Sequence, residues 1–360
     1  MGKPHVKLFI PGPVEVSPET FAAMSQPMIG HRGSGFQELY ASIQPKLQAL
    51  LYTKNPVFIS TSSAWGVMEA SVRNLVGKKV LNCCCGAFSD KWFDVSKKCG
   101  TDADALKVEW GQPILPDAVD AKLKTGQFDA ITLIHNETST GLMNPLAEIA
   151  AVVKKYPDVM FIVDSVSSMT AVKIDTDALG IDVLLAGVQK AWALPPGLAV
   201  FACSERALKK AATVPARGFY FDFLEFKANH DKNMTISTPS IPHIYGLKFK
   251  LDQIEKEGIE NRYARHAKMA QMTRAWAKSR GFELLPPPGY ESLTLTCVKN
   301  NKNIDVAKLQ KALKEKYSVL IDGGYGQLKG KTFRLAHMGD ETPETVAQLH
   351  EMLDDCLKSL

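Results

Sequence analysis

The chain has 360 residues, of which 45% are hydrophobic and 22% are charged, and its net charge at pH 7 is +5. These values are typical of a globular protein with one large domain and a smaller one. The lysines are interspersed with acidic or apolar residues, as in the segment KLQKALKEKY (308–317), which argues against a nucleic-acid-binding stripe. No uncharged run is long enough to span a membrane. We therefore expect neither nucleic acid nor a membrane as a partner.

The N-terminal segment MGKPHVKLFIPGP lacks the apolar core and the cleavage site of a signal peptide. Its Met-Gly start resembles a myristoylation signal, but Val6 stands where that signal has Ser or Thr. We expect a cytoplasmic protein.

Seven cysteines occur, and three of them are consecutive, at Cys83, Cys84 and Cys85. Because successive strand residues point to opposite faces of a sheet, three in a row do not converge on one metal ion. There is no C-x-x-C pair, and the odd count argues against a disulfide framework. We expect small apolar side chains at a buried strand end and predict no metal site.

Apolar runs and amphipathic stretches alternate through the first part of the chain. The runs predict seven strands, at residues 56–60, 79–85, 105–110, 128–136, 159–166, 182–188 and 198–204. Strand–helix alternation with nearly continuous aliphatic runs is typical of a mostly parallel sheet covered by helices on both faces. Only the turn WALPPG (192–197) separates the last two strands, so we expect that pair to be antiparallel.

The pattern changes at about Thr238. One long helical region, 241–281, leads into short strands and helices and a terminal helix from Thr342. We therefore predict an α/β protein in three parts. These are an N-terminal arm (1–15) packed near the smaller domain, a large domain (16–258) with the seven-stranded sheet, and a smaller α+β C-terminal domain (259–360).

Polar residues follow several of the predicted strands, and ligands of a parallel α/β sheet bind beyond the carboxyl ends of its strands. Ser62 and Ser63 follow the first strand and begin a helix, whose N-terminus can bind an anion such as phosphate. An ordinary serine N-cap also explains them. Phe88 follows the second strand, and a polar cluster from Glu137 to Thr140 follows the fourth.

Asp164 and Lys190 lie at the ends of the fifth and sixth strands. A charged side chain at a buried strand end is costly unless it has a partner. One interpretation is a structural ion pair between the two, and the other is an active site; these residues alone leave both open. The functional interpretation has a specific form. An amine, a carboxylate, a helix N-terminus and an aromatic ring suit the aldehyde, ring nitrogen, phosphate and ring of pyridoxal 5′-phosphate (PLP). No nucleotide-binding G-x-G-x-x-G or Walker A sequence occurs.

Eight longer motifs occur in order along the chain. They are PGPVEVSPE (11–19), GHRGSGF (30–36), GAFSDKW (86–92), HNETSTG (135–141), VDSVSS (163–168), GVQKAWALPPG (187–197), STPSIPHIYGL (237–247) and FRLAHMG (333–339). With this set, the chain resembles the class V (fold-type I) PLP-dependent aminotransferases nearly end to end. The resemblance is greatest to their alanine–glyoxylate, serine–glyoxylate and serine–pyruvate branch.

The resemblance implies a role for individual residues. Lys190 matches the lysine that forms a Schiff base with the cofactor, and Asp164 matches the partner of its ring nitrogen. Arg334 matches the arginine that holds the substrate carboxylate by a bidentate pair, and Gly12 is also placed at the substrate. The other implied cofactor residues are Ser63, Ala64 and Trp65 in the phosphate loop, Gln189 beside it, Phe88 stacked on the ring, Ser139 near the phenolic oxygen, Val166, and Thr238.

Thr238 matches a residue that reaches the phosphate from the other subunit, so the resemblance implies a homodimer with shared active sites. Two departures from the family pattern affect phosphate binding. The loop STSSAWG (60–66) lacks the usual glycines, and Thr235 stands where a relative has tyrosine.

The implied reaction is ping-pong transamination between alanine or serine and glyoxylate or pyruvate, with Lys190 as the general base. An aspartate-using aminotransferase of the same class is an alternative, because any nearby Arg or Lys could bind a second carboxylate. A PLP lyase or cysteine desulfurase is less favoured. A desulfurase needs a cysteine on a mobile loop, whereas Cys297 and Cys356 fall on a predicted strand and the terminal helix. Intact Lys190, Asp164 and Arg334 argue against an inactive relative.

Overall fold

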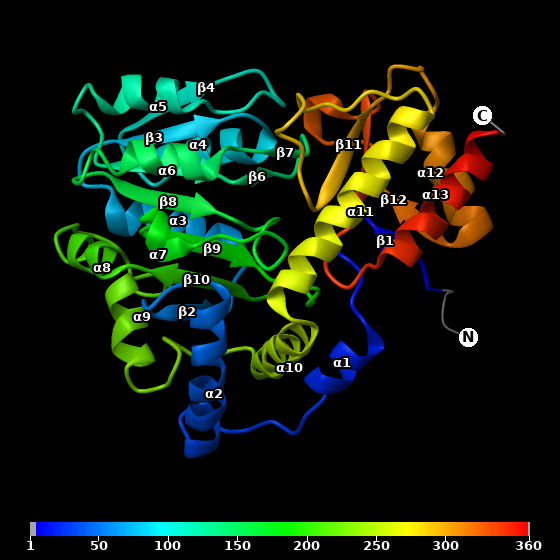
Figure 1. Ribbon diagram of the computed structural model, residues 1–360. Coiled ribbons are helices and arrows are strands. Elements are labelled where there is room, and N and C mark those ends of the chain that lie inside the picture. Colours follow the sequence, from blue (N-terminus) through cyan, green and yellow to red (C-terminus); the bar gives the residue numbers. More distant parts are fainter. Residues whose placement is uncertain (1–4, 359–360) are drawn as a thin grey trace.

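The computed structural model describes residues 5–358, and its largest feature is a seven-stranded sheet with strand order β2-β10-β9-β8-β5-β3-β4 (Figure 1). Strand β10 is antiparallel to both of its neighbours, and the other neighbouring strands are parallel. The mostly parallel sheet and the antiparallel last pair are therefore confirmed. The strands are β2 (Val57–Ser60), β3 (Val80–Cys84), β4 (Ala103–Lys107), β5 (Ala130–Ile134), β8 (Met160–Asp164), β9 (Val183–Gly187) and β10 (Ala199–Cys203).

Strand β4 begins and ends earlier than the predicted range 105–110. Its register with β3 explains the difference, because Ala103 lies opposite Val80 and Lys107 lies opposite Cys84. The edge strand therefore ends where its only partner in the sheet ends. Beyond it, Val108 still donates one backbone hydrogen bond to the carbonyl of Cys84, at 3.0 Å.

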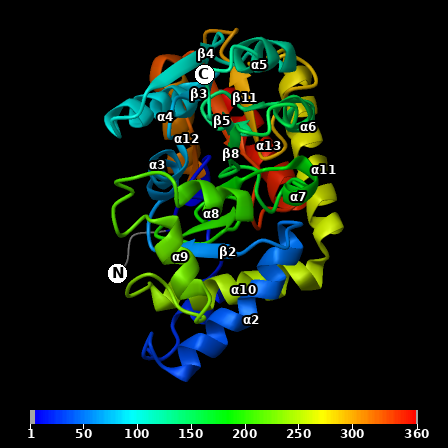
Figure 2. The ribbon, with the colours of Figure 1, turned by 90° about the vertical axis from the view of Figure 1, so that its left-hand side faces the viewer.

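Helices cover both faces of the sheet, as Figure 2 shows from the side. Alternate residues of one strand enter different cores: Phe161 and Val163 pack on one face and Ile162 on the other. The first face carries α2 (Ser34–Leu50), α5 (Pro116–Leu123), α6 (Leu146–Val153) and α10 (Ile241–Glu257). The second carries α3 (Ala64–Leu75), α4 (Ala87–Lys98), α8 (Glu205–Ala211) and α9 (Phe223–His230). Burial on both faces explains why the strands other than the edge strand β4 are mostly apolar.

The three consecutive cysteines are buried at the end of β3, as expected. Cys83 and Cys85 belong to the core on the first face of the sheet. Within residues 5–358, no group of three His, Cys, Asp or Glu side chains is placed to hold a metal ion. No helix in the same range combines the length and the apolar character that are needed to cross a bilayer.

The long helical region is broken in two at Gly258, contrary to the single helix that the sequence predicted. Helix α10 ends at Glu257 and α11 (Ile259–Ser279) begins directly afterwards. Gly258 has φ = +81°, a conformation that glycine adopts without strain and that ends a helix. In Figure 1, α11 (yellow) crosses the molecule between the large sheet and the C-terminal strands.

The C-terminal elements build a separate core around Phe282, Leu309, Phe333 and Leu353. They are β11 (Leu295–Lys299), α12 (Val306–Tyr317), β12 (Val319–Ile321), a short 3₁₀ helix (Gly326–Leu328), β13 (Thr332–Ala336) and α13 (Pro343–Leu357), with Thr342 as the N-cap of α13. Strands β11 and β13 pair antiparallel. Near the N-terminus, β1 (Lys7–Phe9) pairs parallel with β12, and α1 (Pro18–Met24) contacts α10.

Three small elements complete the chain: β6 (Asn136–Glu137), β7 (Leu142–Met143) and α7 (Thr176–Leu179). The domain limits after residues 15 and 258 stay predictions. Residues 1–4 of the predicted arm and 359–360 of the predicted C-terminal domain lie outside the described residues.

Candidate active site

A pocket of about 460 Å³ lies beyond the carboxyl ends of the parallel strands. This is the edge of the sheet where the sequence predicted a ligand site. Eight of the predicted residues line the pocket: Ser63, Ala64, Trp65, Phe88, Asp164, Val166, Gln189 and Lys190. Met68, Ile134 and Thr138 also line it and were not predicted to do so.

The N-terminus of helix α3 faces this pocket. Ser63 is the N-cap, but its hydroxyl makes no capping hydrogen bond. The hydroxyl of Ser62 instead donates to the carbonyl of Ser63 at 2.9 Å. Backbone N–H groups at the start of α3 therefore keep their capacity to bind an anion.

Gly66 explains how the loop folds without the other glycines that are usual in the family. A Cβ atom at Gly66 would lie 2.7 Å from the ring of Phe221 and 2.8 Å from the hydroxyl of Ser62, so no other residue fits without movement of these groups. Glycine is therefore required at position 66, where Phe221 packs against the backbone, whereas the loop accommodates side chains at Ser62, Ala64 and Trp65. The loop therefore reaches the start of α3 with one glycine.

Lys190 follows β9 and points into the pocket from beneath the N-terminal segment. Its amine donates to the carbonyl of Pro11 and lies 5.9 Å from the ring centre of Phe88. Gly12, with φ = +125°, passes so close that an added Cβ would lie 3.2 Å from the amine. Gly12 therefore lies beside Lys190, close to the predicted site. Burial, assisted by the charge of Arg334, lowers the pKa of Lys190 to about 8.

Asp164 is the last residue of β8, and its carboxyl accepts a hydrogen bond from the backbone N–H of Val166 at 2.6 Å. Burial raises the pKa of Asp164 to about 7. Asp164 and Lys190, both among the described residues, do not form an ion pair; their polar atoms contact backbone groups instead. The structural ion pair that the sequence left open is therefore wrong.

Glu137 connects Phe88 to Ser139. Its buried carboxylate accepts hydrogen bonds from the hydroxyl of Ser139 at 2.6 Å and from the backbone N–H groups of Phe88 and Ser89 at 3.4 and 3.0 Å. It thereby fixes the start of α4, which carries Phe88, beside the loop after β5. The sequence showed Glu137 in a polar cluster but gave no sign of this role.

Arg334 lies on β13 and is 4% exposed. Its Nε donates to Asp322 at 2.7 Å, and its Nη1 donates to the carbonyl of Thr138 at 2.7 Å. Tyr325 lies between the guanidinium, at 5.6 Å from its ring centre, and the ring of Phe88, at 5.0 Å. Arg334 is therefore joined to the pocket through Thr138 and Tyr325.

Sequence reasoning missed Asp322 and Tyr325. The only signal was an aspartate directly after an apolar run, in VLIDGG (319–324), followed by an aromatic residue between glycines. That pattern is common in ordinary turns. The antiparallel bridge between Asp322 and Arg334, which brings the two side chains together, is a long-range contact that local patterns do not reveal.

Thr238, like Gly12, Ser139 and Arg334, is a predicted site residue that does not line the pocket. It is exposed in the segment before α10 and is not among the residues that line the pocket. The hydroxyl of Thr235, where a relative's tyrosine was missing, donates to the carbonyl of Ser237 at 2.8 Å. Neither threonine lines the pocket of its own chain.

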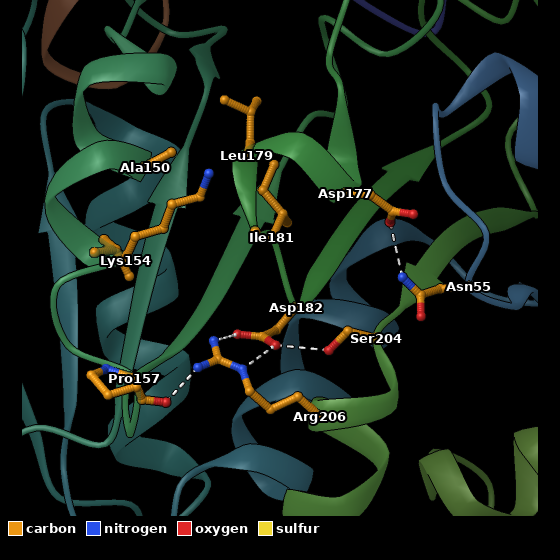
Figure 3. A pocket seen from close by; sticks show the side chains of 12 residues that line it. Asn55, Ala150, Lys154, Pro157, Asp177, Leu179, Ile181, Asp182, Ser204 and Arg206 are labelled. Carbon is orange, nitrogen blue, oxygen red and sulfur yellow. Dashed lines mark hydrogen bonds and ion pairs between the residues drawn. The ribbon is translucent and has the colours of Figure 1, made fainter.

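A larger pocket, of about 770 Å³, lies at the opposite edge of the sheet (Figure 3). Asp182 and Arg206 meet there, with Arg206 Nε 3.0 Å from a carboxylate oxygen of Asp182. Ser204 donates to the same carboxylate at 2.7 Å, and Arg206 also donates to the carbonyls of Pro157 and Val159. The hydrogen-bonding groups of Asp182, Ser204 and Arg206 are thus paired with one another or with backbone carbonyls. They connect the start of β9 to α8, and we see no reactive group among them.

A buried amine, a buried carboxylate, an aromatic ring and an uncapped helix N-terminus thus surround one pocket, the arrangement of an enzyme that binds a phosphorylated aldehyde cofactor. The family model "Aminotransferase class-V" matches residues 22–330. An uncharacterized aminotransferase of Methanocaldococcus jannaschii is 39% identical over 92% of this chain and 87% of its own. The chain therefore belongs to the class V aminotransferases.

Two further relatives have more specific names. The serine–glyoxylate aminotransferase of Methylorubrum extorquens is 30% identical over 94% of this chain and 87% of its own. The crystal structure of alanine–glyoxylate aminotransferase from Nostoc sp. superposes with a TM-score of 0.94, at 28% identity, over 99% of this chain and 96% of its own. The predicted class and fold are confirmed, and the protein is an aminotransferase.

Proposed function

We propose that this aminotransferase uses PLP to move the amino group of alanine or serine to glyoxylate or pyruvate by a ping-pong mechanism. One observation carries the proposal: the buried amine of Lys190 enters the same pocket as Asp164, Phe88 and the uncapped N-terminus of α3. The serine– and alanine–glyoxylate names of the two relatives support the choice of substrates.

The donor set fits PLP group by group. The N-terminal N–H groups of α3 and the hydroxyl of Ser63 suit its phosphate, and the ring of Phe88 suits one face of its ring. Asp164 suits the protonated ring nitrogen, because a buried carboxylate gains most from a cationic partner. The proposed contacts also include Gln189, Val166, Trp65 and Ala64. Ser139, whose hydroxyl accepts from the backbone N–H of Ala87, is proposed to lie near the phenolic oxygen.

Lys190 has two proposed tasks, to hold the cofactor covalently and to act as the base. When bound, PLP accepts the electron pair that remains on the substrate Cα after its proton leaves. The Nζ of Lys190 takes that proton, which requires a neutral amine. A pKa of about 8 gives a useful neutral fraction near physiological pH, unlike the ordinary lysine value of 10.5.

The uptake of PLP by the cofactor-free protein tests this amine directly. The neutral form reacts with the aldehyde, so we expect the uptake rate to rise with pH, with a midpoint near 8. Stopped-flow absorbance over a pH series measures it. A midpoint near 10.5 would show that Lys190 keeps the ordinary lysine value in the folded chain.

Arg334 is proposed to bind the substrate carboxylate, with Gly12 near the same substrate. Arg334→Ala removes a charge-assisted hydrogen bond that both substrates share, so KM should rise about 10- to 100-fold for donor and acceptor alike. The visible absorbance of the bound cofactor should stay normal, because Arg334 does not line the cofactor pocket. Unchanged KM values for both substrates would remove Arg334 from this role.

Steady-state kinetics with a panel of amino acids and 2-oxo acids test the substrates. We expect alanine or serine with glyoxylate or pyruvate to give the highest kcat/KM, and parallel double-reciprocal lines as in a ping-pong mechanism. Aspartate as the best donor would favour the alternative within the class. A lyase or desulfurase has less support, because Cys297 is buried on β11 and Cys356 lies on α13.

The remaining sequence expectations are a homodimer with shared sites and a cytoplasmic location. The exposed position of Thr238, away from the pocket of its own chain, is compatible with a contact to a partner's phosphate site. Sedimentation measures the oligomeric state. A Thr238→Ala variant that lowers PLP affinity in a dimer supports the shared site, and cell fractionation tests the compartment.

A further inference from the structure

We infer that Asp322 selects against substrates with a second carboxylate, so that the substrates of this site carry a single carboxylate. The inference rests on the proposed function, whose substrates all carry one carboxylate, and it assigns the residue that sets this limit. Asp322 is held directly opposite Arg334 by paired backbone hydrogen bonds, in which Arg334 N–H donates to the Asp322 carbonyl at 2.8 Å. Its position opposite Arg334 therefore follows from this isolated antiparallel bridge, one residue beyond the end of β12.

The carboxylate of Asp322 already occupies one edge of the arginine. Its Oδ1 accepts from Arg334 Nε at 2.7 Å and from the backbone N–H of Gly324 at 2.8 Å. The Nη1 of Arg334 donates to the carbonyl of Thr138. Of the three guanidinium nitrogens, Nη2 is the one without a protein partner among the described residues. Arg334 can therefore hold one further carboxylate, and the predicted bidentate pair has no access to Nε.

The guanidinium is not able to turn away from this arrangement. Tyr325 covers one side of it, with the ring centre 5.6 Å from Cζ, and is itself stacked on Phe88. The arginine is 4% exposed, so the surrounding chain fixes its orientation. An arginine fixed in this way presents the same nitrogen to each incoming substrate.

The balance of charge gives the selection. The pair of Arg334 and Asp322 is neutral overall, so a substrate's first carboxylate gains the local hydrogen bonds of Nη2 with little net attraction. A second carboxylate beside Arg334 would meet the charge of Asp322, whose side chain is 26% exposed next to the buried arginine. The charge of Lys190 also acts on Arg334, and the proposed covalent bond to the cofactor occupies that amine. Like charges at close range in a buried site repel strongly.

The test compares Asp322→Asn with the parent holoenzyme. Asparagine keeps the oxygen that accepts from Arg334 Nε and removes the charge, so the arginine keeps its orientation. Isothermal calorimetry with propionate and succinate, which lack an amino group and do not react, gives the two affinities. Steady-state kinetics with alanine and aspartate give the matching ratio of kcat/KM. Asp94→Asn, an exposed position on α4, is the control for the loss of one charge.

We expect the parent to bind propionate more tightly than succinate. Asp322→Asn should shift the ratio of the two affinities toward succinate by about tenfold or more, while Asp94→Asn leaves it unchanged. The kcat/KM ratio of aspartate to alanine should move in the same direction. Ratios that stay within twofold of the parent would overturn the inference, as would failure of either anion to bind. If Asp322→Asn fails to fold, Asp322→Ser serves as the second variant with the same criteria.

These outcomes separate the inference from the proposed function. A shifted ratio of anion affinities without transamination of any donor would contradict the proposed function and leave the selection by Asp322 in place. Transamination with an unshifted ratio would support the proposed function and overturn the selection by Asp322.

Discussion

Replacing Lys190 by alanine should lower transamination by at least about 10⁴-fold, because the same side chain is proposed to attach the cofactor and to move the Cα proton. Covalent attachment and proton transfer act at different stages, so their loss compounds. The variant should also lose the visible absorbance that the covalently bound cofactor gives. Turnover and the absorption spectrum of the PLP-treated protein measure the two effects separately.

Lys209→Ala is the matched control, since the Lys209 side chain is 76% exposed on α8 and pairs with Glu205 on the same helix. It should leave both the turnover and the spectrum unchanged. Exogenous small amines offer a second check, because an amine that diffuses into the vacated space should restore part of the proton transfer. A Lys190→Ala enzyme with normal turnover would disprove the assignment.

Replacing Asp164 by asparagine should lower turnover by at least about 10²-fold, because a neutral amide does not keep the cofactor's ring nitrogen protonated. The effect on stability should have the opposite sign. In the cofactor-free protein, burial raises the pKa of Asp164 from 3.8 to about 7. Between these pH values the folded chain binds more protons than the unfolded chain, so the free energy of unfolding falls as the pH rises.

The cofactor-free Asp164→Asn protein should therefore be more stable than the parent at pH 8, by a few kcal/mol. This advantage should shrink as the pH is lowered toward 4, where the carboxyl of the folded parent is protonated and that of the unfolded chain begins to be. Urea unfolding of both proteins across this range measures it. The matched control is Asp182→Asn, which removes a buried carboxylate that is paired with Arg206 and should destabilise the chain. A destabilised Asp164→Asn protein at pH 8 would mean that Asp164 is structural.

The sheet and the residues at its carboxyl edge could be predicted because the necessary signals are local. Most strands are short apolar runs; Asp164 ends one of them, and Lys190 lies shortly after another. The end of β4 and the helix break at Gly258 were harder to predict from the sequence. The first depends on the register with β3, and the second on a left-handed glycine within an otherwise continuous helical pattern.

The parts of the site that the sequence did not reveal depend on contacts between distant segments. Glu137 acts through helix α4, Pro11 accepts from Lys190 across 179 residues of the chain, and Asp322 meets Arg334 through an isolated antiparallel bridge. Such contacts leave no periodic pattern behind. Thr238 is the reverse case. The motif predicted a site residue there, but Thr238 does not line the pocket of its own chain.

The most direct test of the account is to identify the residue that holds the cofactor. Borohydride treatment of the PLP-loaded protein makes the bond between the cofactor's carbon and the lysine nitrogen permanent, and peptide mass spectrometry then locates the modified residue. We predict one modified residue in each chain, at Lys190. A cofactor fixed to a different lysine, or a protein that remains unmodified under these conditions, would contradict the account.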